Sequence, residues 1–111
     1  MIIQAKEFNE FLIAQVQVKE ANLTEAETFK AKIMSIVDEG HKQIIVDFAL
    51  VDYVDSSFLG ALVSALKYAM SKEADISVMH LNKDILNLFE LIRMDKVFRI
   101  YKNLPESLYE Q

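Results

Sequence analysis

The chain has 111 residues, a net charge of −5, one proline, two glycines and no cysteine. Its length fits one domain, and an apolar fraction of 52% supplies a core. The lack of cysteine excludes a disulfide framework and a cysteine metal site. No signal peptide begins the chain, no apolar run approaches the roughly 20 residues that span a bilayer, and no basic cluster suits nucleic acid. We therefore expect one cytoplasmic domain over residues 1–111 that binds no nucleic acid and inserts into no membrane.

The first part of the chain has the alternation of an antiparallel hairpin. Residues 2–7 and 11–18 are predicted strands, with a turn at residues 8–10 between them. From Ala14 to Val18, apolar residues alternate with glutamines, which is the period of a strand. The outer strand would form a sheet edge, so a homodimer that pairs through this edge is left open.

The segment "NLTEAETFKAKIMSIVDEG", residues 22–40, is a predicted helix. Two capping-box patterns compete for its start, one beginning at Asn22 and one at Thr24. Gly40 is placed to end the helix. The apolar face at helical spacing consists of Ala26, Phe29, Ile33, Ile36 and Val37.

A short apolar run at residues 43–48 predicts a strand that is buried on both faces. A second helix follows the joint "VDYVDSSFLG". Its predicted apolar stripe consists of Leu59, Leu62, Val63, Leu66 and Met70.

The last third of the chain continues the alternation of strands and helices. "DISVMHL", which begins at Asp75, predicts a strand, and Asn82 is placed to cap a third helix. "VFRIY" predicts a short last strand, and "LPESLYE" a terminal helical turn with Pro105 near its start. The residues predicted to face inward from the third helix are Ile85, Leu88, Phe89 and Ile92.

The predicted element order is ββαβαβαβα. Strands that alternate with helices indicate parallel pairing, and the opening hairpin adds an antiparallel pair at one side. The fold class is therefore α/β, with a mixed sheet of four or five strands and about four helices.

The joint "VDYVDSSFLG", residues 51–60, places two carboxylates and two hydroxyls where a strand passes into a helix. In α/β sheets, ligands and reactive groups lie beyond the carboxyl ends of strands. The free amides at a helix start also attract negative charge. Two interpretations follow. Asp55, Ser56 or Ser57 caps the helix, or one of the serines receives a phosphate.

The segment "QIIVDFALVDYVDSSFLGALVSAL" resembles the signature of STAS domains, and of bacterial anti-sigma factor antagonists in particular. In that family a strand ends in an aspartate, and Asp-Ser-Ser/Thr-Gly-Leu-Gly opens a helix after a short loop. "NLTEAETFKAKIMSIVDEG" is similar to the family's first helix, and "LNKDILNLFELIRMDKVFRIY" to its last helix and strand. The resemblance extends across nearly the whole chain.

The resemblance implies that Ser56 is the phosphorylated serine, with Asp55 and Ser57 as its neighbours in the motif. Proteins of this type are substrates and not enzymes, and no cofactor or metal is implied. The unphosphorylated form binds an anti-sigma factor that is also a serine kinase, so that the sigma factor is released to act in transcription. The phosphorylated form dissociates, and a serine phosphatase resets it.

We expect the partner surface to extend from the joint along the second helix. Small residues there would let a partner, or the chain's own sheet, approach closely. Phe58 stands where the family has a glycine, and it would either block close approach or anchor a different partner. The residues expected at this surface are Asp52, Phe58, Gly60, Ala61, Ser64 and Tyr68.

The replacement at Phe58 also supports an alternative function. The chain would then be a STAS module that binds without switching, in a signalling scaffold or in a lipid or anion transport complex. Phosphate turnover at Ser56 separates the two functions.

Two other classes fit the residues poorly. A receiver domain would explain Asp47, Asp52 and Asp55, but its acidic pair should follow the first strand, whereas Glu7 and Glu10 lie at the hairpin turn. A serine hydrolase or a nucleotide-binding loop would need Gly-x-Ser-x-Gly or a P-loop, and the chain has neither. His41 and His80 are isolated in the sequence and predict no metal site.

Overall fold

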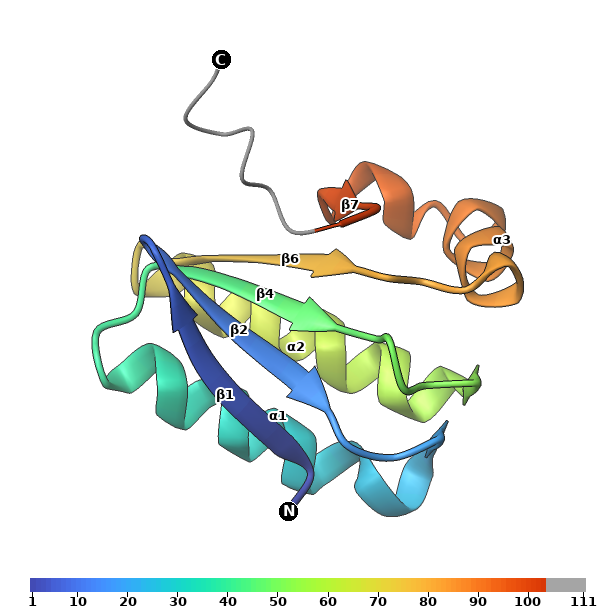
Figure 1. The fold of residues 1–111 in the computed structure, drawn as a ribbon, viewed down its shortest axis with the longest axis horizontal. Helices are drawn as coiled ribbons and strands as arrows, with labels where there is room; N and C mark the ends of the chain where they lie inside the picture. Colours follow the sequence, from blue (N-terminus) through green and yellow to red (C-terminus); the bar gives the residue numbers. More distant parts are fainter. Residues whose placement is uncertain (104–111) are drawn as a thin grey trace.

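The computed structural model describes residues 1–103 and contains a five-stranded sheet in the order β1-β2-β4-β6-β7 (Figure 1). β1 is antiparallel to β2, and the other neighbours are parallel. β1 lies at one edge of the sheet, and the predicted self-association through it stays a prediction. The strands are β1 (Ile3–Phe8), β2 (Phe11–Val16), β4 (Gln43–Asp47), β6 (Asp75–Met79) and β7 (Ile100–Tyr101).

Three α-helices are present in the described part of the chain: α1 (Leu23–Asp38), α2 (Ser56–Ser71) and α3 (Lys83–Leu91). α1 and α2 lie side by side on one face of the sheet (Figure 1). A 3-10 turn, η1 (Met94–Lys96), follows α3. The α/β prediction with a mixed sheet is confirmed, while the predicted helical turn around Pro105 lies outside the described residues.

A second, two-stranded sheet was not predicted. It consists of β3 (Glu20–Ala21) and β5 (Tyr53–Val54), which pair in parallel just before α1 and α2. Strands of two residues carry no periodic signal, so sequence patterns miss them. This pairing fixes the starts of the two helices relative to each other.

The helix boundaries follow from short polar side chains. The Asn22 side chain accepts a hydrogen bond from Thr24 N at 3.0 Å, so the earlier of the two predicted starts of α1 is the one used. Asn82 caps α3 by accepting from Ile85 N at 2.8 Å, as predicted. Gly40 follows the end of α1 with φ of 101°, a conformation that glycine adopts without strain.

The main core lies between the sheet and its helices. A chain of phenylalanine contacts runs through it. The Phe29 and Phe58 rings are 4.5 Å apart, Phe48 lies 6.5 Å from Phe58, and Phe89 connects Phe48 to Phe98 at 6.4 and 6.3 Å. A smaller cluster on the opposite face of the sheet consists of Phe11, Ile13, Ile45 and Met79.

Three predictions at element ends are wrong. Met70 is exposed because the buried stripe of α2 is centred on Leu62, Ala65 and Ala69, and Met70 lies about 100° around the helix from Ala69, outside the stripe. Ile92 is exposed because α3 has already ended. The last strand is shorter than predicted, because Phe98 packs into the core instead of pairing in the sheet.

Candidate functional site

Asp55 joins the starts of two helices. Its Oδ1 accepts a hydrogen bond from Phe58 N at 2.9 Å, which caps α2, and its Oδ2 accepts one from Leu23 N at 2.9 Å, the first residue of α1. The Asp55 amide in turn donates to Ala21 O at 3.1 Å. One carboxylate therefore satisfies an amide at each of two helix N-termini, which would otherwise lack partners.

Ser56 and Ser57 are the first two residues of α2, and neither caps it, because Asp55 takes that role. Ser56 is exposed and Ser57 is half-buried. Within residues 1–103, neither hydroxyl makes a hydrogen bond. A phosphate on Ser56 would stand at a helix N-terminus, where the helix dipole favours negative charge.

The loop before Ser56 is anchored through its backbone. Lys19 O accepts from the amides of Asp52 and Tyr53 at 2.8 and 3.1 Å. Asn82 Nδ2 donates to Val51 O and Asp52 O at 3.3 and 3.2 Å. The Asp52 side chain remains exposed, as its predicted place at a partner surface requires.

Three exposed apolar side chains lie at this end of the sheet, and the sequence reasoning missed them. Leu23, whose amide binds Asp55, is 69% exposed, Tyr53 of β5 is 56% exposed, and Leu50 of the preceding loop is 47% exposed. For Leu50 and Tyr53 the available signal was the run of apolar residues in the stretch "FALVDYV", which a solvated loop does not need.

The small residues of α2 divide between two environments. Gly60 and Ser64 are exposed on the helix, whereas Ala61 is buried. A Cβ atom added at Gly60 would meet no atom within 4 Å, so packing inside the described chain does not require a glycine there. The structure therefore corrects the expectation for Ala61, which packs on its own core.

The expectation that Phe58 lies at the partner surface is also corrected. The Phe58 side chain is 0% exposed and packs against Phe29 and Phe48, so it does not lie on the surface where it was expected. The STAS motif has a glycine at this position, whereas the side chain of this chain points into its own core. The backbone amide of Phe58 still faces Asp55 as a capped helix requires.

Tyr68 lies away from Ser56. The two residues are about 18 Å apart along the helix axis, at 1.5 Å per residue. Its hydroxyl donates to Asp38 Oδ1 of α1 at 2.5 Å, and the Lys72 ammonium lies 5.7 Å from its ring centre. The hydrogen bond to Asp38 raises the pKa of Tyr68 above its ordinary value. The structure does not bring Tyr68 to the surface around Ser56.

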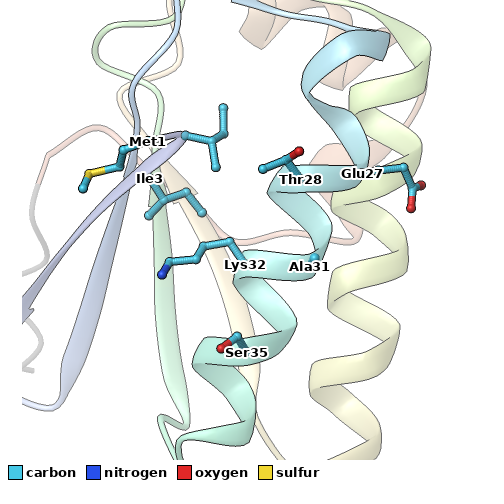
Figure 2. Close-up of a pocket in the computed structure, with 8 residues that line it drawn as sticks. Met1, Ile3, Glu27, Thr28, Ala31, Lys32 and Ser35 are labelled. Carbon is cyan, nitrogen blue, oxygen red and sulfur yellow. The ribbon is translucent and has the colours of Figure 1, made fainter.

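A wide groove lies elsewhere, between the start of the chain and the outer side of α1. Figure 2 shows Met1 and Ile3 opposite Thr28, Ala31, Lys32 and Ser35 of α1. Its volume is about 820 Å³, and its walls are mostly apolar. None of the predicted site residues lines this groove.

Over residues 1–103, no group of three or more histidine, aspartate and glutamate side chains is placed to hold a metal ion. No helix in the same range is both long and apolar enough to cross a membrane.

Known proteins resemble this chain in sequence and in fold. A Thermotoga maritima protein described as a candidate anti-sigma factor antagonist is 26% identical over 93 residues, which cover 83% of this chain and 82% of that protein. A crystal structure of a T. maritima protein with the same description gives a TM-score of 0.83 at 22% identity, over 97% of this chain and 92% of that one.

Two further structures show the same fold at low identity. The Bacillus anti-sigma factor antagonist SpoIIAA in its unphosphorylated form gives a TM-score of 0.71 at 15% identity, over 97% of this chain and 94% of that one. The murine anion transporter Slc26a9 gives 0.76 at 14% identity, over 94% of this chain but only 18% of the transporter. The sequence model of the family described as "Mlab, STAS domain" matches residues 19–104. The chain therefore belongs to the STAS domain family.

Proposed function

We propose that the protein is an anti-sigma factor antagonist that is switched by phosphorylation of Ser56. The observation that carries the proposal is the position of Ser56, exposed at the first residue of α2 while Asp55 caps the helix. The relatives described as antagonists support it. So does the related fold of SpoIIAA, a protein whose structure is known in unphosphorylated and phosphorylated forms.

The chain acts as a substrate in this scheme. An anti-sigma factor that is also a serine kinase transfers the γ-phosphoryl group of ATP to Ser56 Oγ, the hydroxyl proton leaves, and ADP is released. The phosphate brings about −1.5 to −2 charges at neutral pH. A serine phosphatase in the cytoplasm returns the protein to its binding form by hydrolysis.

The added charge would lie beside an exposed apolar surface, where it can weaken the binding of a partner. Exposed Leu23, Leu50 and Tyr53 supply apolar contact area at the same end of the sheet. Introducing a doubly charged group into such a contact, or opposite an acidic partner residue, costs several kcal/mol. The fold itself tolerates the phosphate, because the N-terminus of α2 favours negative charge.

Gly60 and Ser64 extend this surface along the exposed side of α2. A glycine in a helix interior costs about 1 kcal/mol relative to alanine, and no internal contact at Gly60 explains it. Close approach of a partner backbone would explain it. The partner surface therefore consists of Asp52, Ser56, Gly60 and Ser64 with the three exposed apolar residues.

The test is mass spectrometry of the protein purified from its own cells, followed by binding assays with its kinase partner. We expect one phosphate on Ser56, loss of partner binding in Ser56→Asp, and constitutive binding in Ser56→Ala. Ser57→Ala is the matched control, because this neighbouring hydroxyl is half-buried, and it should change neither property. Absence of phosphate under every growth condition, with Ser56→Ala indistinguishable from wild type in cells, would refute the switch.

A second candidate is a non-switching STAS module of a transport complex. The observation that favours it is the similarity to a segment of the anion transporter Slc26a9. In that case Ser56→Ala and Ser56→Asp would bind a membrane-bound transport protein as wild type does. The same set of variants thus decides between the two functions.

A further inference from the structure

We propose that the sheet face opposite α1 and α2 carries a second binding site, which takes a small organic anion with an apolar body. The site is a cavity of about 300 Å³ at the carboxyl ends of β2, β4 and β6. This volume corresponds to roughly ten water molecules, or a ligand of about ten heavy atoms. The polar residues that line this cavity are Gln4, Lys6, Gln15, Asp47 and His80.

The strand register builds this cavity. Gln4 pairs with Gln15, Gln15 with Asp47, and Asp47 with Met79, which forms one row across four strands. Side chains in one row point to the same face of a sheet. Lys6 and Ile13 form the next row on this face. The cavity is thus lined by both polar and apolar side chains of the same sheet face.

Asp47 is a positioning residue in this site. It is 5% exposed, its Oδ1 accepts from Ala49 N at 2.9 Å, and its Oδ2 accepts from Gln15 Nε2 at 3.1 Å. His80 Nδ1 lies 2.9 Å from the same Oδ1. Because an ionised carboxylate only accepts, Nδ1 carries the proton of this contact. The negative charge of Asp47 is therefore engaged by three donors of the chain.

His80 is held in an unusual backbone conformation. Its φ is +62°, a left-handed value that is strained for a residue with a side chain. This conformation accompanies the contact with Asp47, which directs the other ring nitrogen, Nε2, away from the carboxylate. Nε2 has no hydrogen-bond partner among the described residues, although His80 lines the cavity.

The unused groups around the cavity are mainly donors. The Lys6 ammonium and the Gln4 side-chain NH₂ group are donors that have no hydrogen bond or ion pair within residues 1–103. His80 Nε2 is also without a partner there, and with the ring proton on Nδ1 it is an acceptor. Phe8, Ile13 and Met79 supply apolar wall. A carboxylate bound by the Lys6 ammonium and the Gln4 side-chain NH₂ group, with its apolar part against these walls, matches this arrangement.

Hexanoate is the probe, with hexanol and hexylammonium as ligands of equal length and different charge. Binding is followed by NMR chemical shifts of the full chain. We expect saturable shifts at Gln4, Lys6 and His80 with hexanoate, and weaker binding of both other ligands. Lys6→Ala should weaken binding about tenfold, the effect of one charge-assisted hydrogen bond.

Lys32→Ala is the matched control, because Lys32 is the lysine of the other groove (Figure 2). It should leave hexanoate binding unchanged, as should Ser56→Asp, since the site does not depend on the phosphorylation switch. Lys6 is exposed, so Lys6→Ala tests the site in a folded protein. The proposal is overturned by an absence of saturable shifts at these residues, by equal binding of hexanol, or by loss of binding in Lys32→Ala.

Discussion

Two aspartates stand at the two ends of the loop between β4 and α2, and the chain uses them differently. Asp55 accepts hydrogen bonds from two backbone amides, those of Leu23 and Phe58. Asp47 accepts one from a backbone amide and is also bound by the side chains of Gln15 and His80. Backbone partners are fixed by the helices that they belong to, whereas side-chain partners can rotate. Asp55 therefore fixes the start of α2, which carries Ser56. Asp47 instead holds side chains that can move when a ligand binds.

The largest expected effect on stability comes from Phe58→Ala, because Phe58 contacts the surroundings of both Asp55 and Asp47. The Phe58 amide caps α2 through Asp55, and its ring packs on Phe48, the residue after Asp47. Truncating a fully buried phenylalanine removes contacts and leaves a cavity, so we expect a loss of about 3–5 kcal/mol in the free energy of unfolding.

Urea unfolding measures this loss, and Tyr53→Ala is the control, since Tyr53 is an exposed aromatic residue close by. The control should change stability by less than about 0.5 kcal/mol. An equally small effect of Phe58→Ala would contradict its place in the core.

The next prediction compares the same substitution at the two aspartates. Asp55→Asn keeps one acceptor oxygen, and its NH₂ group then faces the amide of Leu23 or Phe58, which cannot turn away. We expect a loss of about 1–3 kcal/mol, the cost of an unsatisfied amide. In Asp47→Asn, the Gln15 side-chain amide can turn so that its oxygen accepts from the new NH₂ group. Gln17, whose Nε2 donates to Gln15 Oε1 at 2.9 Å, must turn with it, and the loss should be about 1 kcal/mol or less.

Chemical denaturation of both variants gives the ranking. Amide hydrogen exchange then locates the damage, which Asp55→Asn should concentrate at Leu23 and Phe58. Asp52→Asn is the control, because the Asp52 side chain is exposed. A greater loss in Asp47→Asn than in Asp55→Asn would reverse the distinction between the two aspartates.

The sequence predicts the elements of this fold better than it predicts the site. Periodicity and capping residues predict the strands and the three helices, because these signals are local. Whether Asp55, Ser56 or Ser57 caps α2 depends on the pairing of β3 with β5, which brings Leu23 to Asp55. Such a contact between distant segments leaves no periodic trace in the sequence.

The burial of Phe58 and the exposure of Gly60 have a similar origin. Both lie in the first turns of α2, and a resemblance to a motif assigns them to one surface. Their sides of the helix differ, and only the packing against Phe29 and Phe48 separates them. The Asp47–His80 contact was missed because Asp47 ends β4 and His80 follows β6, and only the pairing of these two strands brings the residues together.

Gly60→Ala tests the proposed partner surface, because it should raise stability and weaken partner binding. Alanine is the better helix residue and meets no atom within 4 Å, so the free energy of unfolding should rise by about 0.5–1 kcal/mol. The added methyl group should weaken partner binding if the partner backbone approaches Gly60 closely. Urea unfolding and a titration with the partner measure the two effects.

Ala61→Gly is the reference variant for this test, because residue 61 is buried in the chain's own core. It should lower stability and leave the affinity for the partner unchanged. Unaltered partner binding in Gly60→Ala would remove Gly60 from the partner surface.

The smallest expected effect lies at the other end of α2, where Tyr68 donates to Asp38. This hydrogen bond raises the pKa of Tyr68 in the folded protein above the unfolded value near 10. Because the neutral phenol is the favoured form, its contribution to stability is complete below about pH 10 and disappears as pH rises through the folded pKa. The difference in stability between wild type and Tyr68→Phe should therefore be constant to about pH 9 and shrink above pH 10.

Urea unfolding across this pH range provides the measurement, with Tyr53→Phe as the control. Tyr53 has no hydrogen bond from its hydroxyl within the described residues, so its variant should follow wild type. A difference that grows with pH would reverse the assigned direction of the proton. A difference independent of pH would mean that Asp38 and Tyr68 do not interact in solution, and α1 and α2 would then be held together at this end by packing alone.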